Sequence, residues 1–445
     1  VRLGVDEVGR GPHTRIWLLK EKPKSEQEPE LLRAEMAEAA MDMLSLSKIQ
    51  IRPELLRRKG KGAIVRCPLC GEWYPAAFGR ICRSCQGDSP YEQGPGLAFQ
   101  EPRLTAVPVE QAVGQHVLHD MTKIVPQQSK GAVFKAGQNI DVGDICRLQQ
   151  MGRFRVYTEE AAGDNPDFVH EDAAVRAFAE LMPGEGVAPQ GEPSEGKINF
   201  RAERDGLFEV DRERLAAFNM LPDVMCATRH GMSVVRKGAR LAGSRAIPLL
   251  LARPVFLKAL SLLDGGPLFR VRPMRKARVG TLVTGTEVFQ GLIQDRFAPI
   301  IRQKAENLGC TVVGERVAPD DAPAIGAALT QLLDLGADLI ITTAGLSVDP
   351  DDVTRKALLD AGLTDLSFGL PVLPGTMTLL GRIGGAQVLG VPACALFYKT
   401  TALDLMLPRL LANVPMSRAD LALLGHGGLC LECKSCDFPK CTFGR

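Results

Sequence analysis

Two turns decide the fold of this chain: Val283-Thr284-Gly285-Thr286-Glu287 and Thr342-Thr343-Ala344-Gly345-Leu346-Ser347-Val348-Asp349-Pro350-Asp351-Asp352-Val353-Thr354. Each turn follows an apolar run, opens into a helical pattern, and places small residues at the turn with carboxylates just beyond it. This order is typical of a parallel sheet that binds a phosphorylated ligand where its strands end. The carboxylates could also bind a divalent cation.

Strand and helix patterns alternate around these turns over residues 277–415, which predicts an α/β doubly wound domain. Apolar runs indicate the strands, and three- and four-residue spacing of apolar residues indicates the helices. We expect strands at 278–284, 311–318, 338–343 and 387–391, with helices at 295–308, 321–335, 352–361 and 397–412.

A chain of 445 residues is too long for one ordinary hydrophobic core, so several domains are expected. Residues 1–98 combine a helical pattern near 27–48 with a cysteine-rich segment. Residues 104–190 and 191–276 show short strands, turns and few helices, which predicts two smaller mixed or β-rich domains. Residues 416–445 form a cysteine-rich tail.

The overall composition excludes some classes of function. A net charge of +2 gives no reason to expect nucleic acid as the main partner. The sequence contains no apolar run long enough to span a membrane and no signal-peptide pattern at residues 1–7. We therefore expect a cytoplasmic protein without a membrane partner.

Eight of the twelve cysteines fall into two tight clusters, which indicates metal sites in a reducing compartment. The first, Cys67-x2-Cys70-x11-Cys82-x2-Cys85, has the paired spacing of a structural zinc ribbon with four thiolate ligands. The second, Cys430-x2-Cys433-x2-Cys436-x4-Cys441, is denser and fits either a [4Fe–4S] cluster or a second zinc ion.

The two turns supply the candidate ligand-binding residues. Asp residues at a helix start are often simple N-caps, but three carboxylates after the second turn exceed what capping requires. We expect catalytic or cation-binding roles for Asp352, Glu287 and Asp295. The remaining candidates for binding the ligand are Thr284, Gly285, Thr342, Thr343, Gly345, Ser347, Asp349, Pro374 and Gly375.

Residues 342–354 resemble the signature loop of the molybdopterin-binding domain, roughly T-T-G-G-T-G-x-x-x-x-D-V-T. Residues 284–287 resemble its T-G-D-E turn, Leu373-Pro374-Gly375 resembles its P-G-K-P loop, and 390–393 resemble the start of its G-L-P-G-N-P loop. Molybdopterin adenylyltransferases and molybdopterin molybdenumtransferases share this domain. Residues 109–118 and 136–157 also resemble the N-terminal part of the molybdenumtransferases.

The resemblance implies molybdenum or tungsten cofactor biosynthesis. In such enzymes molybdate or tungstate takes the place of AMP on adenylated molybdopterin, and Mg²⁺ neutralises the phosphates. The site lies between two chains, so the resemblance also implies a homodimer. Asp352 matches the functional Asp of the second loop, while Glu287 and Asp295 match the acidic positions of the first.

Three departures from the family pattern leave an alternative open. Ala344 replaces a Gly, Thr376-Met377 replace the Lys-Pro of P-G-K-P, and Ala393-Cys394 replace a Gly-Asn. Loss of the lysine removes a cation that would face phosphate. The alternative is a non-catalytic carrier that delivers molybdopterin cofactor to a molybdenum or tungsten oxidoreductase. The ribbon segment Cys67-Pro68-Leu69-Cys70-Gly71-Glu72 resembles the zinc ribbon of a formylmethanofuran dehydrogenase component, which agrees with this theme.

Overall fold

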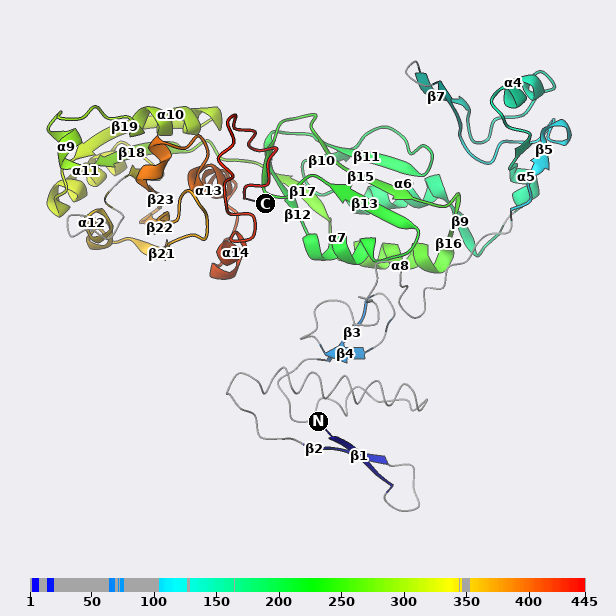
Figure 1. Ribbon diagram of the computed structural model, residues 1–445, viewed down its shortest axis with the longest axis horizontal. Helices are drawn as coiled ribbons and strands as arrows, with labels where there is room; N and C mark the ends of the chain where they lie inside the picture. Colours follow the sequence, from blue (N-terminus) through cyan, green and yellow to red (C-terminus); the bar gives the residue numbers. More distant parts are fainter. Residues whose placement is uncertain are drawn as a thin grey trace.

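The computed structural model describes residues 2–7, 14–19, 64–68, 71, 73–75, 104–125, 129–163, 165–343, 345 and 353–444 (Figure 1). The helix expected near 27–48 lies outside these residues. So do three of the ribbon cysteines, Cys70, Cys82 and Cys85, and three candidates of the second loop, Ser347, Asp349 and Asp352.

A six-stranded sheet forms the centre of the C-terminal domain, in the order β19-β18-β20-β23-β22-β21 (Figure 1). The first four strands in this order are parallel, and β22 and β21 complete one edge as antiparallel strands. The bounds are β18 (Arg278–Thr284), β19 (Thr311–Ala318), β20 (Leu339–Thr343), β21 (Thr364–Phe368), β22 (Leu379–Ile383) and β23 (Ala386–Val391).

Helices cover both faces of this sheet, which confirms the predicted α/β doubly wound fold. One buried cluster joins the sheet to α10 and α13 through residues such as Ile301 and Met406. A second cluster joins the other face to α11 and α12 through Leu329 and Leu358. The helices are α9 (Thr286–Phe289), α10 (Phe297–Asn307), α11 (Ala322–Asp334), α12 (Thr354–Asp360), η3 (Ala393–Leu396), α13 (Ala402–Leu411) and α14 (Arg418–Leu423).

The helix expected over 397–412 begins later in the structure. Thr401 accepts from Leu403 N, and Asp404 accepts from Thr401 N, so a capping box fixes the start of α13 at Ala402. The separate 3₁₀ turn η3 ends at Leu396, before the expected start of this helix.

Residues 165–272 fold around one hydrophobic cluster that contains Phe178, Phe200 and Phe269. The predicted boundary near residue 190 falls inside this unit, because β10 before it pairs with β11 after it. The strands are β9 (Phe168–His170), β10 (Val187–Pro189), β11 (Lys197–Ala202), β12 (Gly206–Val210), β13 (Val224–Thr228), β14 (Ser233–Val235), β15 (Arg240–Ala246), β16 (Leu250–Ala252) and β17 (Phe269–Arg272). The helices are α6 (Glu171–Leu181), α7 (Arg212–Asn219) and α8 (Arg253–Leu263).

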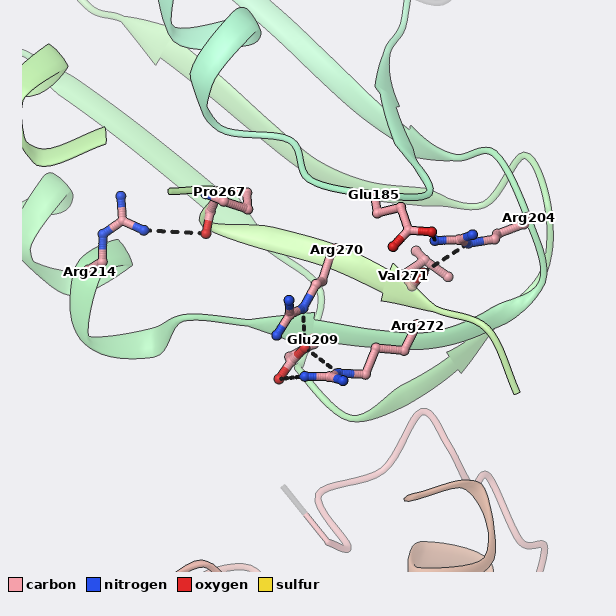
Figure 2. A network of polar contacts seen from close by, with 8 residues as sticks. All are labelled: Glu185, Arg204, Glu209, Arg214, Pro267, Arg270, Val271 and Arg272. Carbon is pink, nitrogen blue, oxygen red and sulfur yellow. Dashed lines mark hydrogen bonds and ion pairs between the residues drawn. The ribbon is translucent and has the colours of Figure 1, made fainter. Parts of the chain in front are cut away.

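A carboxylate shared by two arginines ties β12 to β17 in this unit (Figure 2). Glu209 Oε2 accepts from Arg270 Nε at 2.5 Å and from Arg272 Nε at 2.6 Å. Burial opposes ionisation of Glu209, but the hydrogen bonds from Arg272 and Arg270 outweigh it and hold its pKa below the usual value. These two ion pairs to Glu209 stabilise the association of β12 with β17 on one face of the sheet.

A small separate core lies in residues 104–163, built around Val117, Phe134 and Leu148. Its elements are β5 (Val107–Pro108), η2 (Val109–Gln111), β6 (Met121–Val125), β7 (Ser129–Phe134), α4 (Asp144–Gln150), β8 (Arg155–Val156) and α5 (Glu159–Ala162). Two short hairpins precede it, formed by β1 (Arg2–Glu7) with β2 (Thr14–Leu19) and by β3 (Ile64–Arg66) with β4 (Trp73–Pro75). Across the described residues, no helix combines the length and the apolar character needed to cross a membrane.

Candidate functional site

The strand order places a topological switch point between β18 and β20. The chain leaves β18 for β19 on one side and then crosses to β20 on the other. In open α/β sheets, the helices that follow such strands diverge to opposite faces and leave a crevice at the strand ends. Thr284 ends β18 and Thr343 ends β20, so the two predicted loops begin at this crevice.

Three threonines connect the two loops at the crevice. Thr284 Oγ1 donates to Thr343 O at 2.8 Å, and Thr284 Oγ1 lies 2.9 Å from Thr354 Oγ1. Since the single hydroxyl proton of Thr284 goes to the carbonyl, Thr354 is the donor in the second bond. All three residues are buried. The end of β18, the end of β20 and the start of α12 therefore share one hydrogen-bonded chain.

Gly345 is needed where the second loop leaves β20. Its φ is +56°, a conformation that residues with a side chain rarely adopt. A Cβ there would lie 2.1 Å from Thr354 Oγ1 and 3.3 Å from Thr284 Oγ1. The backbone of the second loop therefore passes directly against the threonine pair, which supports the predicted role of Gly345 in shaping the site.

The first loop turns sharply at Gly285, whose φ is +148°, and continues as the short helix α9. Glu287 is exposed. Its carboxylate lies beside the turn, with Oε1 3.5 Å from the position that a Cβ on Gly285 would occupy. Glu287 is therefore free to meet a cation or ligand hydroxyl from solvent. Of Glu287 and Asp295, the two predicted carboxylates that the structure describes, Glu287 has the placement that suits the expected role better.

Asp295 caps a helix in this structure. Its Oδ1 accepts from Phe297 N at 2.7 Å and from Ala298 N at 3.3 Å, at the start of α10. That is the ordinary role of an Asp before a helix. Its catalytic role, like that of Asp352, stays a prediction.

Sequence reasoning missed Asp320. Its Oδ2 accepts from Thr286 N at 2.8 Å and from Thr286 Oγ1 at 3.1 Å, which holds the first loop from the end of β19. The neighbouring Asp321 caps α11 by accepting from Ala324 N. Two consecutive acidic residues between a strand and a helix were a usable signal, because one helix start needs only one N-cap.

Pro374 and Gly375 contact the start of α13. Pro374 O accepts from Ala402 N at 3.1 Å, and a Cβ on Gly375 would lie 2.5 Å from Ala402 Cβ. Gly375 O also accepts from Thr378 Oγ1 at 2.7 Å. The loop is thus held close to the domain by its backbone, and no substituent at Gly375 fits without movement.

Two further hydroxyls at the end of β20 have spare hydrogen-bonding capacity. Thr342 Oγ1 and Thr343 Oγ1 are buried and have no hydrogen-bond partner within the part of the chain that the structure describes. A buried hydroxyl without a partner is costly unless a ligand or water meets it. These groups support the placement of a polar ligand at this edge.

The structure describes one cysteine of the first cluster and all four cysteines of the second. Cys67 is buried against the core of residues 174–271, and Cys67 O accepts from Gly71 N at 2.9 Å in the first knuckle of the ribbon. The C-terminal cysteines are all described. Nevertheless, among the described residues no three His, Cys, Asp or Glu side chains form a group able to hold a metal ion.

Comparison with known proteins agrees with this geometry. Residues 280–412 match the family model described as probable molybdopterin binding domain. The C-terminal α/β domain is a molybdopterin-binding domain. Its match begins within β18, ends just after α13, and includes the Thr284–Thr354 contact. Residues 58–92 match the FmdE treble clef zinc finger, and residues 106–160 match a domain of unknown function.

Curated relatives resemble only part of the chain. A CinA-like protein of Mycobacterium marinum is 39% identical over 98 residues, which covers 20% of this chain and 23% of that protein. A CinA-like protein of Mycobacterium avium is 41% identical over 94 residues, which covers 19% of this chain and 22% of that protein. The chain thus spans less than a quarter of either relative.

Solved structures of two kinds are also similar. The molybdopterin biosynthesis enzyme MoaB from Thermus thermophilus is 26% identical, with 32% of this chain and 99% of that chain covered, at a TM-score of 0.26. The molybdopterin biosynthesis MoeA protein from Pyrococcus horikoshii is 16% identical, with 70% of this chain and 75% of that chain covered, also at a TM-score of 0.26.

Proposed function

We propose that this protein acts in molybdenum or tungsten cofactor biosynthesis. It binds adenylated molybdopterin where β18 and β20 end, and inserts molybdate or tungstate while AMP leaves. The N-terminal zinc finger is a structural module, and two chains form a homodimer that completes the site. The exposed Glu287 and the acidic second loop, including Asp349 and Asp352, hold Mg²⁺.

The observation that carries the proposal is the hydrogen-bonded chain that runs from the Thr354 hydroxyl through the Thr284 hydroxyl to the backbone carbonyl of Thr343. It fixes the ends of two neighbouring parallel strands at the switch point, where phosphate-bearing ligands bind in such folds. Gly345 brings backbone to the same place without a side chain. Backbone N–H groups close to a phosphate stabilise negative charge without reorganisation.

A site for Mg²⁺ and phosphate is supported by the exposed carboxylate of Glu287 and by the acidic residues in the sequence of the second loop. When bound, Mg²⁺ neutralises the phosphates and stabilises charge on the departing AMP. The chain's own contribution is to hold the ligand. The buried hydroxyls of Thr342 and Thr343 are available for hydrogen bonds, and Ser347 lies in the loop that follows them. Little covalent chemistry is required of the protein.

A carrier function is the second candidate, supported by the loop after Pro374. Thr376 stands where the family pattern has a phosphate-facing lysine, and its Oγ1 donates to Val372 O at 3.1 Å. This hydroxyl stabilises the loop and supplies no positive charge. A carrier would bind the cofactor at the same edge and deliver it to a molybdenum or tungsten oxidoreductase.

The test is binding of molybdopterin and of adenylated molybdopterin to the purified protein with Mg²⁺, followed by addition of molybdate. Binding with molybdate-dependent release of AMP supports the insertion enzyme. Binding without release supports the carrier. Failure to bind either form overturns the proposal and leaves a different ligand for this domain.

Asp352→Ala is the variant that tests the catalytic assignment. We expect it to abolish AMP release while the melting temperature stays close to that of the unaltered protein. Asp360→Ala is the matched control, because Asp360 is an exposed carboxylate at the end of α12 and should leave release unchanged. Full AMP release by Asp352→Ala would show that this residue is not catalytic.

A further inference from the structure

A pocket of about 430 Å³ lies where the unit of residues 165–272 meets the molybdopterin-binding domain. It is lined by β14 and the turn before it, by the end of α10, by α13 and by the C-terminal tail. Figure 1 shows this tail, in dark red, between α13 and the strands β12 and β17. No described residue of the crevice between β18 and β20 lines the pocket. We propose that it binds a small organic anion with an aromatic or aliphatic body.

The pocket has the size and the surface of a small-molecule site. Such sites span roughly 300–1,000 Å³ and combine an apolar lining with a few polar groups. The apolar part of this lining comes from Met232, Val234, Leu407, Phe438 and Phe443. Leu407 and Phe443 are also buried in the core of the molybdopterin-binding domain, which fixes this side of the pocket. These side chains can cover the apolar body of a ligand.

Arg236 supplies a positioned cation at the junction of the two units. Its Nη1 donates to Asp205 Oδ2 at 2.8 Å, and its Nη2 donates to Asn307 O, at the end of α10, at 3.4 Å. A guanidinium has five N–H donors, so these two contacts leave donors for a ligand. Because Arg236 is held before a ligand arrives, binding costs less side-chain entropy.

Lys304 adds a second cation, and the acidic residue beside it is already engaged. Lys304 Nζ donates to Lys399 O at 2.8 Å and pairs with Asp404 Oδ1, which leaves one of its three N–H donors. Asp404 Oδ2 accepts from Thr401 N at 2.8 Å. Asp404 is the single acidic residue of the described lining, and both of its oxygens have donors. The polar side therefore offers hydrogen bonds to an anion and little to a cation.

The turn before β14 is held in an unusual conformation at the same place. Met232 has a φ of +60°, which is uncommon for a residue with a side chain. Met232 N donates to Phe208 O at 2.6 Å, Ser233 Oγ donates to His230 O at 2.6 Å, and His230 Nδ1 donates to Gly231 O at 3.0 Å. Residues held in such conformations are concentrated at ligand sites. This turn therefore gives the pocket a rigid wall.

The test is titration of the full chain with two fluorescent probes of matched shape. Anilinonaphthalene sulfonate carries an anionic group on aromatic rings, and phenylnaphthylamine has the same rings without the sulfonate. We expect the sulfonate to bind and to raise the melting temperature, because a ligand that binds only the folded state stabilises it. Arg236→Gln should weaken binding of the sulfonate about fivefold and leave the affinity for the uncharged probe unchanged.

Two further variants locate the binding site. Arg212→Gln is the matched control, because Arg212 is exposed on α7 and does not line the pocket. Asn307→Trp places a large side chain at an exposed position of the lining and should weaken the binding of both probes. Thermal unfolding shows whether each variant is folded, and Arg236→Gln decides the question if Asn307→Trp is not. Equal affinity of Arg236→Gln and Arg212→Gln for the sulfonate overturns the proposal, as does failure of the unaltered protein to bind it.

Discussion

Thr354 Oγ1 at the start of α12 lies 2.9 Å from Thr284 Oγ1 at the end of β18, although the two residues are 70 positions apart. Thr284 in turn donates to the last residue of β20. This contact fixes the geometry of the crevice before any ligand arrives. A site organised in this way loses little entropy when it binds a ligand.

Replacing Thr354 with Val should weaken both the fold and the site. The change keeps the shape but leaves Thr284 without its donor, at an expected loss of about 1–3 kcal/mol in the free energy of unfolding. Thr330→Val is the control, because its hydroxyl bonds only to Gly326 O within α11 in the described structure. We expect molybdopterin affinity to fall for Thr354→Val and to be unchanged for Thr330→Val. Equal affinity in the two variants would contradict a role for the threonine contact in binding.

Replacing Gly345 with Ala should lower the free energy of unfolding by more than the positive φ of this residue alone explains. Gly362 has a φ of +88° with nothing within 4 Å of its missing Cβ, so Gly362→Ala measures the conformational cost alone, about 1 kcal/mol. Gly345→Ala adds a clash with Thr354. Denaturant unfolding of both variants gives the difference. If both lose the same stability, the backbone does not press against Thr354 as described.

Asp320 should control the first loop through Thr286. We expect Asp320→Ala to lower ligand affinity, because Thr286 loses the carboxylate that accepts its N–H and hydroxyl. Asp321→Ala removes the N-cap of α11, at an expected cost of about 1 kcal/mol in stability, but leaves the loop contact in place. Calorimetric titration together with thermal unfolding separates the two effects. A matched loss of affinity in both variants would mean that helix stability, and not the loop, matters.

Glu171 should make stability depend on pH. Burial, with the nearby charge of Asp172, raises the pKa of Glu171 to about 7. The folded state therefore favours the protonated form, and this stabilisation is complete below pH 4.5 and is lost as pH rises through 7. Glu171→Gln should match the unaltered protein in free energy of unfolding at pH 4 and exceed it at pH 8, with a slope difference of at most about 1.4 kcal/mol per pH unit between these values. Glu180→Gln, exposed on the same helix, should show no such trend.

The sequence alone determined the central strands of the molybdopterin-binding domain. The predicted strands 278–284, 338–343 and 387–391 agree with β18, β20 and β23 to within one residue at either end. Strands buried on both faces read as continuous apolar runs, and short glycine turns mark their ends. The edge strand β21 was missed because its sequence Thr364-Asp365-Leu366-Ser367-Phe368 is mostly polar and exposed. Such a segment becomes a strand only because β22 offers it hydrogen bonds.

The tertiary structure decided which side chains meet. Spacing in the sequence identified Thr284 and Gly345 as loop residues, but only the crossing from β19 back to β20 puts them against Thr354. Asp320 reaches Thr286 for the same reason, because β18 and β19 are neighbours in the sheet. Composition and periodicity report local backbone preferences, whereas contacts between distant residues depend on strand order and helix packing. The same holds for the pocket beside α13, which exists because β14, α10 and the C-terminal tail meet at that helix.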